Sequence, residues 1–272
     1  MSELSRDAVE RLESPLAKKI YFHEEIDSTQ ERARTLAQAG AAHGTLVIAR
    51  VQTGGRGRLG RRWGSPLGGV WMSLVLRPRI PARFAPRVTQ AAAVGVAKTL
   101  WNFGVEARIK WPNDLLVEER KICGILAEFD AGNTVAKYPS SSARDHQANF
   151  IVLGVGLNAN LDPKDLQVDD REVATLQSEL GYDVHLSELL DALLSNLAAE
   201  LERIESFGAV LDDWRALNCT LGKLVRVRRF GRALEGRAVD LTPEGAMLLQ
   251  TPDGTVELFE GEVEHLRQEG RT

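Results

Sequence analysis

The chain has 272 residues, a formal net charge of −4, 43% hydrophobic residues and 26% charged residues, which is typical of a globular protein with room for one large and one small domain. No apolar run reaches the roughly 18 residues of a membrane-spanning helix, and the N-terminus lacks a signal-peptide pattern. With only two cysteines, Cys123 and Cys219, a disulfide framework is excluded as well, and these features together predict a cytoplasmic protein without a membrane partner.

Residues 1–19 are predicted to form an N-terminal extension, with a short polar helix over residues 2–14 before a first strand at residues 19–23. The extension is too short for a winged helix-turn-helix, whose three helices would each take about 11 residues. The negative net charge also argues against nucleic acid as a partner. We therefore expect no DNA binding.

A helix is predicted to begin near Ser28 and to end before Gly40. Ser28 and Glu31 have the spacing of a capping box, in which each side chain accepts a hydrogen bond from an unpaired backbone N–H. A helix start also presents N–H groups and hydroxyls to anions or carbonyl groups. Helix capping is sufficient to explain a serine at position 28. The capping role and a ligand-binding role can also be shared between Ser28 and Thr29, so both are candidates for ligand contacts.

A loop rich in glycine and arginine follows, between predicted strands at residues 46–48 and 70–74. Residues 52–63, which we call the arginine loop, read QTGGRGRLGRRW. Glycines let the backbone approach a ligand closely, and arginines offer planar, permanently charged groups to carboxylate and phosphate oxygens. This combination predicts an anion-binding loop, against the alternative of a solvated loop without function.

Two nucleotide-binding loops are disfavoured by the surrounding sequence. Gly55, Gly57 and Gly60 match G-x-G-x-x-G, but the dinucleotide fingerprint requires a helix at the loop and an acidic residue about 20 positions later. Here GSPLGG at residues 64–69 cannot begin a helix, and residues 77–83 contain no acid. No Gly-Lys-Ser/Thr ending of a Walker loop is present either.

A long helix is predicted over residues 84–103, followed by strands at 108–111, 115–117 and 121–129. Asp114 is a candidate Mg²⁺ ligand, because one carboxylate together with substrate phosphates is a common Mg²⁺ site, although Asn-Asp after proline is also common turn chemistry. Lys121 either extends from its strand into solvent or projects into a cleft as a charge for phosphate.

The next strand, at residues 150–158, is apolar enough for a central position in a sheet. Gly154 and Gly156 within it predict the close approach of a ligand or another backbone. Before it, residues 133–148 form a polar, aperiodic insert, and after it helices are predicted at 187–205, capped by Ser187, and at 207–217.

From Gly222 the pattern changes to five short strands, at residues 224–230, 234–239, 246–249, 256–259 and 263–266. Short strands separated by glycine-containing turns are typical of a small β-barrel. We therefore expect a large domain over residues 20–220 and a small barrel over residues 221–272.

Three motifs in this order resemble those of biotin–protein ligases: the arginine loop, KWPNDL at residues 110–115 and KICGIL at residues 121–126, supported by DST at 27–29 and GVGLN at 154–158. The resemblance extends from Tyr21 to the C-terminus. It implies an α+β fold, in which a mixed-sheet ligase catalytic domain with packed helices precedes a small SH3-like β-barrel. The short extension implies the monofunctional type without an N-terminal DNA-binding domain.

The resemblance also implies a two-step reaction. Biotin and ATP, with Mg²⁺, give biotinyl-5′-AMP and pyrophosphate, and a lysine of a biotin carboxyl carrier protein then takes the biotinyl group. Whether the chain acts as a monomer or a homodimer is left open.

The family's site residues map onto positions of this sequence. The implied biotin contacts are Ser28, Thr29, Gln30 (often Asn in the family), Gln52, Arg56, Gly57, Arg58, Lys121, Gly124, Gly154 and Gly156. The implied ATP contacts are Arg58, Arg61, Trp63, Asn113, Asp114, Lys121 and Asn158. Asp114 is the candidate metal ligand, and Arg58 and Lys121 are the candidate catalytic residues.

The chemistry of the residues agrees with this reaction, because fixed Arg and Lys charges and Mg²⁺ offset the repulsion between a carboxylate and a triphosphate. Two alternatives remain. A lipoate-type acyl-adenylate ligase should show an Arg-Arg-x-Ser-Gly-Gly-Gly motif, which is absent. A non-enzymatic biotin-sensing adaptor would act through the small barrel.

Overall fold

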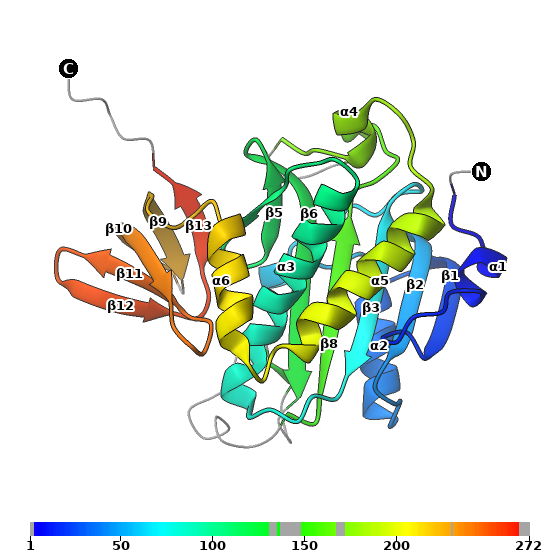
Figure 1. Ribbon diagram of the computed structural model, residues 1–272, viewed down its shortest axis with the longest axis horizontal. Coiled ribbons are helices and arrows are strands. Elements are labelled where there is room, and N and C mark those ends of the chain that lie inside the picture. The colour runs from blue at the N-terminus through cyan, green and yellow to red at the C-terminus, as the bar shows by residue number, and fades with distance from the viewer. Residues whose placement is uncertain (1–2, 131–134, 137–147, 167–171, 230, 267–272) are drawn as a thin grey trace.

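Two sheets organise the chain, an eight-stranded mixed sheet in the large domain and a five-stranded antiparallel sheet in the C-terminal small domain (Figure 1). The computed structural model describes residues 3–130, 135–136, 148–166, 172–229 and 231–266. Within these ranges, no helix has the length and apolarity needed to cross a bilayer.

The large sheet has the strand order β1-β2-β3-β8-β6-β5-β4, with β7 added to β6. Strands β1 and β2 are parallel, and the other neighbouring pairs are antiparallel. The two central strands, β3 and β8, are buried along nearly their whole length, as the apolar sequence of β8 predicts. The strands are β1 (Lys19–Ile26), β2 (Thr45–Gln52), β3 (Val70–Leu76), β4 (Arg108–Lys110), β5 (Asp114–Val117), β6 (Arg120–Asp130), β7 (Val135–Ala136) and β8 (Phe150–Leu157).

Helices cover both faces of this sheet. One face packs against a layer formed by α3 (Ala85–Asn102), α5 (Leu186–Glu202) and α6 (Phe207–Leu217), and the other carries α2 (Thr29–Gln38) (Figure 1). Side chains along β3 alternate between the two faces of the sheet. Met72 and Leu74 belong to the core on the side of α3, α5 and α6, and Val75 packs with α2 on the opposite side. The short helices are α1 (Arg6–Glu10), α4 (Leu176–Leu180) and the 3₁₀ turns η1 (Arg58–Gly60), η2 (Ala82–Phe84) and η3 (Pro163–Asp165).

The small domain has the five predicted strands, in the order β12-β11-β10-β9-β13. Glycines with positive φ lie in two of its turns, Gly231 (74°) and Gly245 (90°), where a side chain would be strained. The predicted succession of a mixed sheet with helices and a small β domain is confirmed. The strands are β9 (Leu224–Arg229), β10 (Arg232–Leu241), β11 (Met247–Thr251), β12 (Gly254–Leu258) and β13 (Glu262–His265).

Two local predictions were wrong. The N-terminal helix spans only Arg6–Glu10, because the flanking Leu4 and Leu16 are buried in the main core and hold the segment against it. Helix α5 begins at Leu186 rather than after a Ser187 cap, since the buried Leu186 already belongs to its apolar face. The connection after β8 contains η3 and α4, which are too short to produce a periodic pattern.

The polar insert at residues 133–148 lies largely outside the described residues. Of this segment, residues 135–136 form β7, which pairs with the end of β6, and Ala148 is buried.

Candidate functional site

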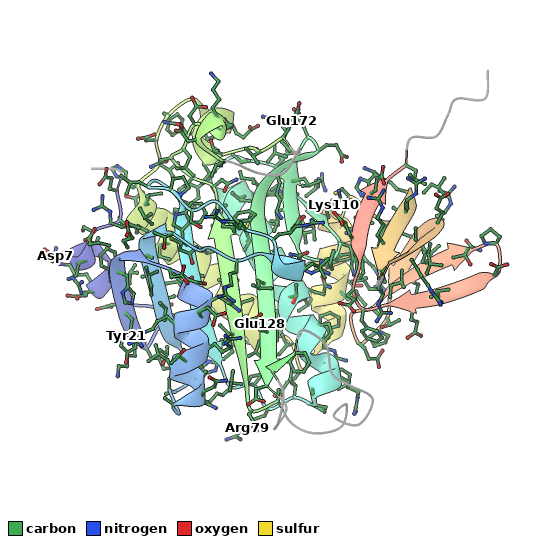
Figure 2. The ribbon with its side chains drawn as sticks, turned by 180° about the vertical axis from the view of Figure 1, so that it is seen from behind. Asp7, Tyr21, Arg79, Lys110, Glu128 and Glu172 are labelled. Carbon is green, nitrogen blue, oxygen red and sulfur yellow. The ribbon has the colours of Figure 1, made fainter. Side chains whose placement is uncertain are left out.

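A cleft opens on the α2 face of the large sheet and reaches the small domain at residues 261–263. Figure 2 shows this face, with α2 over the sheet and Lys110 beside the small domain. Fourteen of the candidate residues line the cleft: Thr29, Gln30, Gln52, Arg56, Gly57, Arg58, Arg61, Trp63, Asn113, Asp114, Lys121, Gly124, Gly154 and Gly156. Motifs from five separate parts of the sequence therefore converge on one site.

The floor of the cleft is formed by glycines on adjacent strands. Strand register pairs Gly124 with Gly156 across β6 and β8, and the ring of Trp63 lies over both. An added Cβ would lie 2.4 Å from Trp63 Nε1 at Gly156 and 2.5 Å from Gln30 Oε1 at Gly154, so neither position has room for a side chain. The side chains of Gln30 and Trp63 thus lie against Gly154 and Gly156, where the sequence predicted a ligand or another backbone.

The arginine loop connects β2 to β3, as predicted, and folds back on itself as a narrow hairpin. Its ends are joined by a bond from Gln52 N to Ser65 O at 3.0 Å, and Trp63 N donates to Gly55 O at 2.9 Å. Gly54 packs against Asp27 so closely that an added Cβ would overlap the Asp27 carboxylate. These contacts hold the loop over the cleft.

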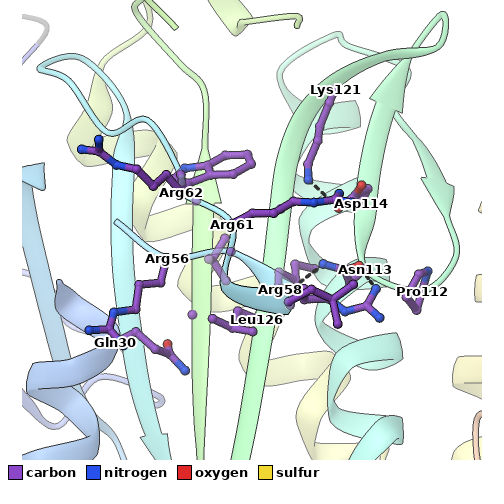
Figure 3. Close-up of a pocket in the computed structure, with 18 of the residues that line it drawn as sticks. Gln30, Arg56, Arg58, Arg61, Arg62, Pro112, Asn113, Asp114, Lys121 and Leu126 are labelled. Atoms are coloured by element: carbon purple, nitrogen blue, oxygen red, sulfur yellow. Dashed lines mark hydrogen bonds and ion pairs between the residues drawn. The ribbon is translucent and has the colours of Figure 1, made fainter. Parts of the chain in front are cut away.

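Three arginines of the loop reach different partners (Figure 3). Arg58 donates to Asn113 Oδ1 at 2.7 Å and to the Gly261 carbonyl at 3.4 Å, so it bridges the large and small domains. Arg61 pairs with Glu262 of the small domain. Arg56 points the other way and pairs with Glu31 on α2.

Lys121 points into the cleft, which resolves the two alternatives that its sequence position left open. Its Nζ lies 2.6 Å from Asp114 Oδ1 and 4.9 Å from the centroid of the Trp63 ring (Figure 3). Both members of the ion pair are largely buried, with side-chain exposures of 15% for Lys121 and 14% for Asp114. The ammonium and the carboxylate are thus already positioned side by side in the cleft.

The charge of the lining is strongly positive. Six cationic side chains and two carboxylates, Asp114 and Glu262, line the cleft; the cations are Arg56, Arg58, Arg61, Arg62, Lys110 and Lys121. This excess in a chain of net negative charge attracts anions to this surface. The cleft therefore suits a polyanionic ligand next to an uncharged polar floor.

Two candidate residues, Ser28 and Asn158, do not line the cleft. Ser28 Oγ accepts from Glu31 N at 3.4 Å and caps α2, but the Glu31 carboxylate pairs with Arg34 and Arg56, so only half of the predicted capping box forms. Asn158 is buried and donates to Lys121 O at 3.3 Å, which supports the Lys121 backbone from behind.

Sequence reasoning missed Ser73 and Glu262 among the residues that line the cleft. Ser73 is a single polar residue inside the apolar strand β3, which was a signal that could have been used. Glu262 gave no local signal, because its contact with Arg61 joins segments about 200 positions apart.

The cysteines do not provide a nucleophile. Complete burial raises the pKa of the Cys123 thiol, and burial raises the pKa of Cys219 to about 11, so both are protonated at neutral pH. Within the described ranges, no three His, Cys, Asp or Glu side chains gather where they could hold a metal ion by themselves.

Comparison with known proteins identifies relatives over nearly the whole chain. Residues 22–138 match the Biotin/lipoate A/B protein ligase family, and residues 220–266 match the Biotin protein ligase C terminal domain. The chain is 31% identical over 254 residues to the bifunctional ligase/repressor BirA of Bacillus subtilis, covering 92% of this chain and 74% of that protein. It is 32% identical over 233 residues to the biotin–[acetyl-CoA-carboxylase] ligase of Paracoccus denitrificans, covering 84% and 92%.

The fold also matches a solved structure, the biotin protein ligase from Aquifex aeolicus in complex with biotin and ATP. The TM-score is 0.73 at 26% sequence identity, and the match covers 92% of this chain and 100% of that one.

Proposed function

The chain belongs to the biotin protein ligase family, and on this premise we propose that it activates biotin with ATP and transfers the biotinyl group to a lysine of a carboxylase. The observation that carries the proposal is the cleft itself, in which a buried polar floor adjoins a cluster of fixed cations. The floor suits the uncharged ring system of biotin, and the cations suit its carboxylate and the phosphates of ATP.

In the first step, a carboxylate oxygen of biotin attacks the α-phosphorus of ATP. The bond from the α-phosphorus to the bridging oxygen breaks, and pyrophosphate leaves with the electron pair. In the second step, the lysine amine attacks the acyl carbon of biotinyl-5′-AMP, the amine loses a proton, and AMP leaves. We propose a biotin carboxyl carrier domain in the cytoplasm as the acceptor.

We assign Lys121 and Arg58 to the charge that develops in the first step. Lys121 Nζ lies at the boundary between the glycine floor and the arginine loop, where the biotin carboxylate and the α-phosphate would meet. Arg58 is fixed by its bond to Asn113, so its guanidinium is positioned before substrates bind. Preorganised cations stabilise the transition state more than flexible ones, because they need no reorganisation.

The biotin ring system is assigned to the floor formed by Thr29, Gln30, Gln52 and the glycines at 124, 154 and 156. Thr29 N donates to Gln52 Oε1 at 2.8 Å, and Thr29 Oγ1 lies 3.0 Å from the same oxygen, so the two polar side chains are held together before a ligand arrives. The ring of Trp63 covers the apolar part of the floor. We assign Arg61, Trp63, Asn113 and Asp114 to the nucleotide.

The residues present also fit a Mg²⁺ ion that accompanies ATP. Mg²⁺ is usually bound by one or two carboxylates together with phosphates and water, and Asp114 is such a carboxylate in the cleft. Bound there, Mg²⁺ would supply positive charge to the phosphates. Asp114 is already held in position by Lys121.

Biotin-dependent exchange of pyrophosphate into ATP tests the first step, and labelling of a carrier-domain lysine tests the second. Exchange that requires biotin, and is not supported by lipoate, is the expected result. Exchange with lipoate alone would favour the lipoate-type ligase, and biotin binding without any exchange would favour a non-enzymatic adaptor.

A further inference from the structure

Two hydroxyls and two amides form a continuous chain of polar contacts in the floor of the cleft. The chain runs from Gln52 Oε1 to Thr29 Oγ1 at 3.0 Å, to Ser73 Oγ at 2.9 Å, and to Gln30 Oε1 at 3.1 Å. Thr29, Ser73 and Gln30 are each at most 4% exposed. Each hydroxyl has one proton to donate, so two protons serve three contacts between oxygens. One of the three contacts therefore lacks a proton.

A flip of the Gln52 or Gln30 side-chain amide, which would exchange its oxygen and nitrogen, cannot supply the missing proton. Gln52 Oε1 accepts from the Thr29 backbone N–H at 2.8 Å, and Gln52 Nε2 donates to Ser65 Oγ at 2.8 Å. Gln30 Nε2 donates to Glu128 Oε2 and to a backbone carbonyl, both at 3.2 Å, and both partners are acceptors only. The oxygens of the two amides are thus fixed at the two ends of the chain.

The two hydroxyl protons can be distributed over the three contacts in several ways. Only one arrangement gives both amide oxygens a donor and also places a proton between the two hydroxyl oxygens. In it, Thr29 donates to Ser73 and Ser73 donates to Gln30 Oε1, while Gln52 Oε1 keeps the backbone N–H. The reverse direction leaves Gln30 Oε1 without its only hydroxyl donor, and a buried acceptor without a donor is costly. The contact without a proton is therefore the one between Thr29 and Gln52.

We propose that Ser73 and Gln30 are positioning residues that make Thr29 and Gln52 a selective acceptor pair for a ligand N–H group. Ser73 takes the proton of Thr29, so that two acceptor oxygens 3.0 Å apart are presented to the cleft. The inference rests on the proposed function, in which the cyclic urea of biotin supplies the N–H. A ring oxygen in the same place would meet two acceptors and be rejected.

The test measures, by calorimetry, the binding of biotin and of two cyclic carbamate analogues, each with one ureido N–H replaced by oxygen. The wild type should prefer biotin to one of these analogues by roughly 10²-fold, because that analogue leaves buried acceptors unpaired. Ser73→Ala allows the Thr29 hydroxyl to turn toward Gln52. Biotin affinity should then fall roughly tenfold while affinity for this analogue changes little, so the preference falls roughly tenfold.

A second variant tests the same chain from its other end. Gln30→Met removes the terminal acceptor but leaves Ser73 in place, so the proton direction can reverse and the preference should again fall. Thr45→Val is the matched control, because it removes a buried hydroxyl at the far end of β2, outside the cleft. It should leave the preference unchanged. Thermal melting confirms that each variant is folded.

Equal weakening of all three ligands by Ser73→Ala and Gln30→Met would overturn the positioning role, because loss of packing alone does not distinguish N–H from oxygen. A wild type that binds biotin and both analogues equally would also overturn it. A wild type that binds no biotin and shows no exchange would instead overturn the proposed function, and the positioning role with it.

Discussion

Replacing Lys121 with Met is the sharpest test of the proposed electrostatic role. Met keeps the apolar stem of the side chain and removes the ammonium from the point where the two substrates meet. Formation of biotinyl-5′-AMP should fall by roughly 10²-fold, equivalent to about 2.7 kcal/mol of transition-state stabilisation. Lys121→Arg retains the charge in a different geometry and should restore only part of the rate.

The same change should lower the stability of the free protein. From the sequence alone, Lys121 is expected to be partly buried, and a partly buried charge is costly. Replacing it with Met would then slightly stabilise the free protein. The structure reverses this expectation, because Lys121 pairs with Asp114 at 2.6 Å and removing it takes this cation from a largely buried carboxylate. We expect a loss of about 1–3 kcal/mol, less than for a fully buried pair. Lys121→Met/Asp114→Asn should recover stability but not activity.

The decisive measurement is a single turnover of adenylate formation at saturating biotin and ATP. Lys164→Met, which removes an exposed lysine outside the cleft, should match the wild type in rate and stability. A wild-type rate for Lys121→Met, with only substrate affinity changed, would make Lys121 a binding residue and refute the electrostatic argument.

Three further predictions follow from the site and from the boundary between the domains. Arg58→Ala should abolish biotin-dependent pyrophosphate exchange with an unchanged circular dichroism spectrum, and undiminished exchange would contradict its role. Residues 52–67 should gain hydrogen-exchange protection when biotin and ATP bind, because bound anions would add contacts to the arginines of a loop that otherwise rests on few backbone hydrogen bonds; equally slow exchange in both states would exclude this. Burial and the charges of Lys223 and Lys110 lower the pKa of His265 to about 4, so the unfolded state binds its proton more readily and stability should fall as pH decreases from about 6.5 to 4. His265→Gln should lose less stability over that window in urea titrations, and an identical loss would show that His265 is not responsible.

The sequence was most informative where one local pattern determines one element. The apolar run of β8 predicted a central strand, and the glycine-rich segment at residues 52–63 predicted a loop between two strands. Contacts between distant segments were inaccessible to this reasoning. Arg58 bonds to the Gly261 carbonyl, 203 positions away, and nothing near either residue indicates the other.

The buried polar residues show a second limit. Ser73 differs from its strand neighbours only in polarity, and its meaning depends on three oxygens that come from other elements. Asn158 belonged to a recognised motif, yet it lies behind the cleft and supports Lys121 through its backbone. A motif identifies which residues gather at a site, whereas burial and register decide which of them face the ligand.

The two arginine contacts with the small domain have a consequence for binding equilibria. Because Arg58 and Arg61 bond to the adjacent residues Gly261 and Glu262, the freedom of the arginine loop depends on the orientation of the small domain. A protein that prefers one orientation of the small domain would change the affinity of the cleft for its ligands. By thermodynamic reciprocity, those ligands would change the affinity for that protein by the same factor.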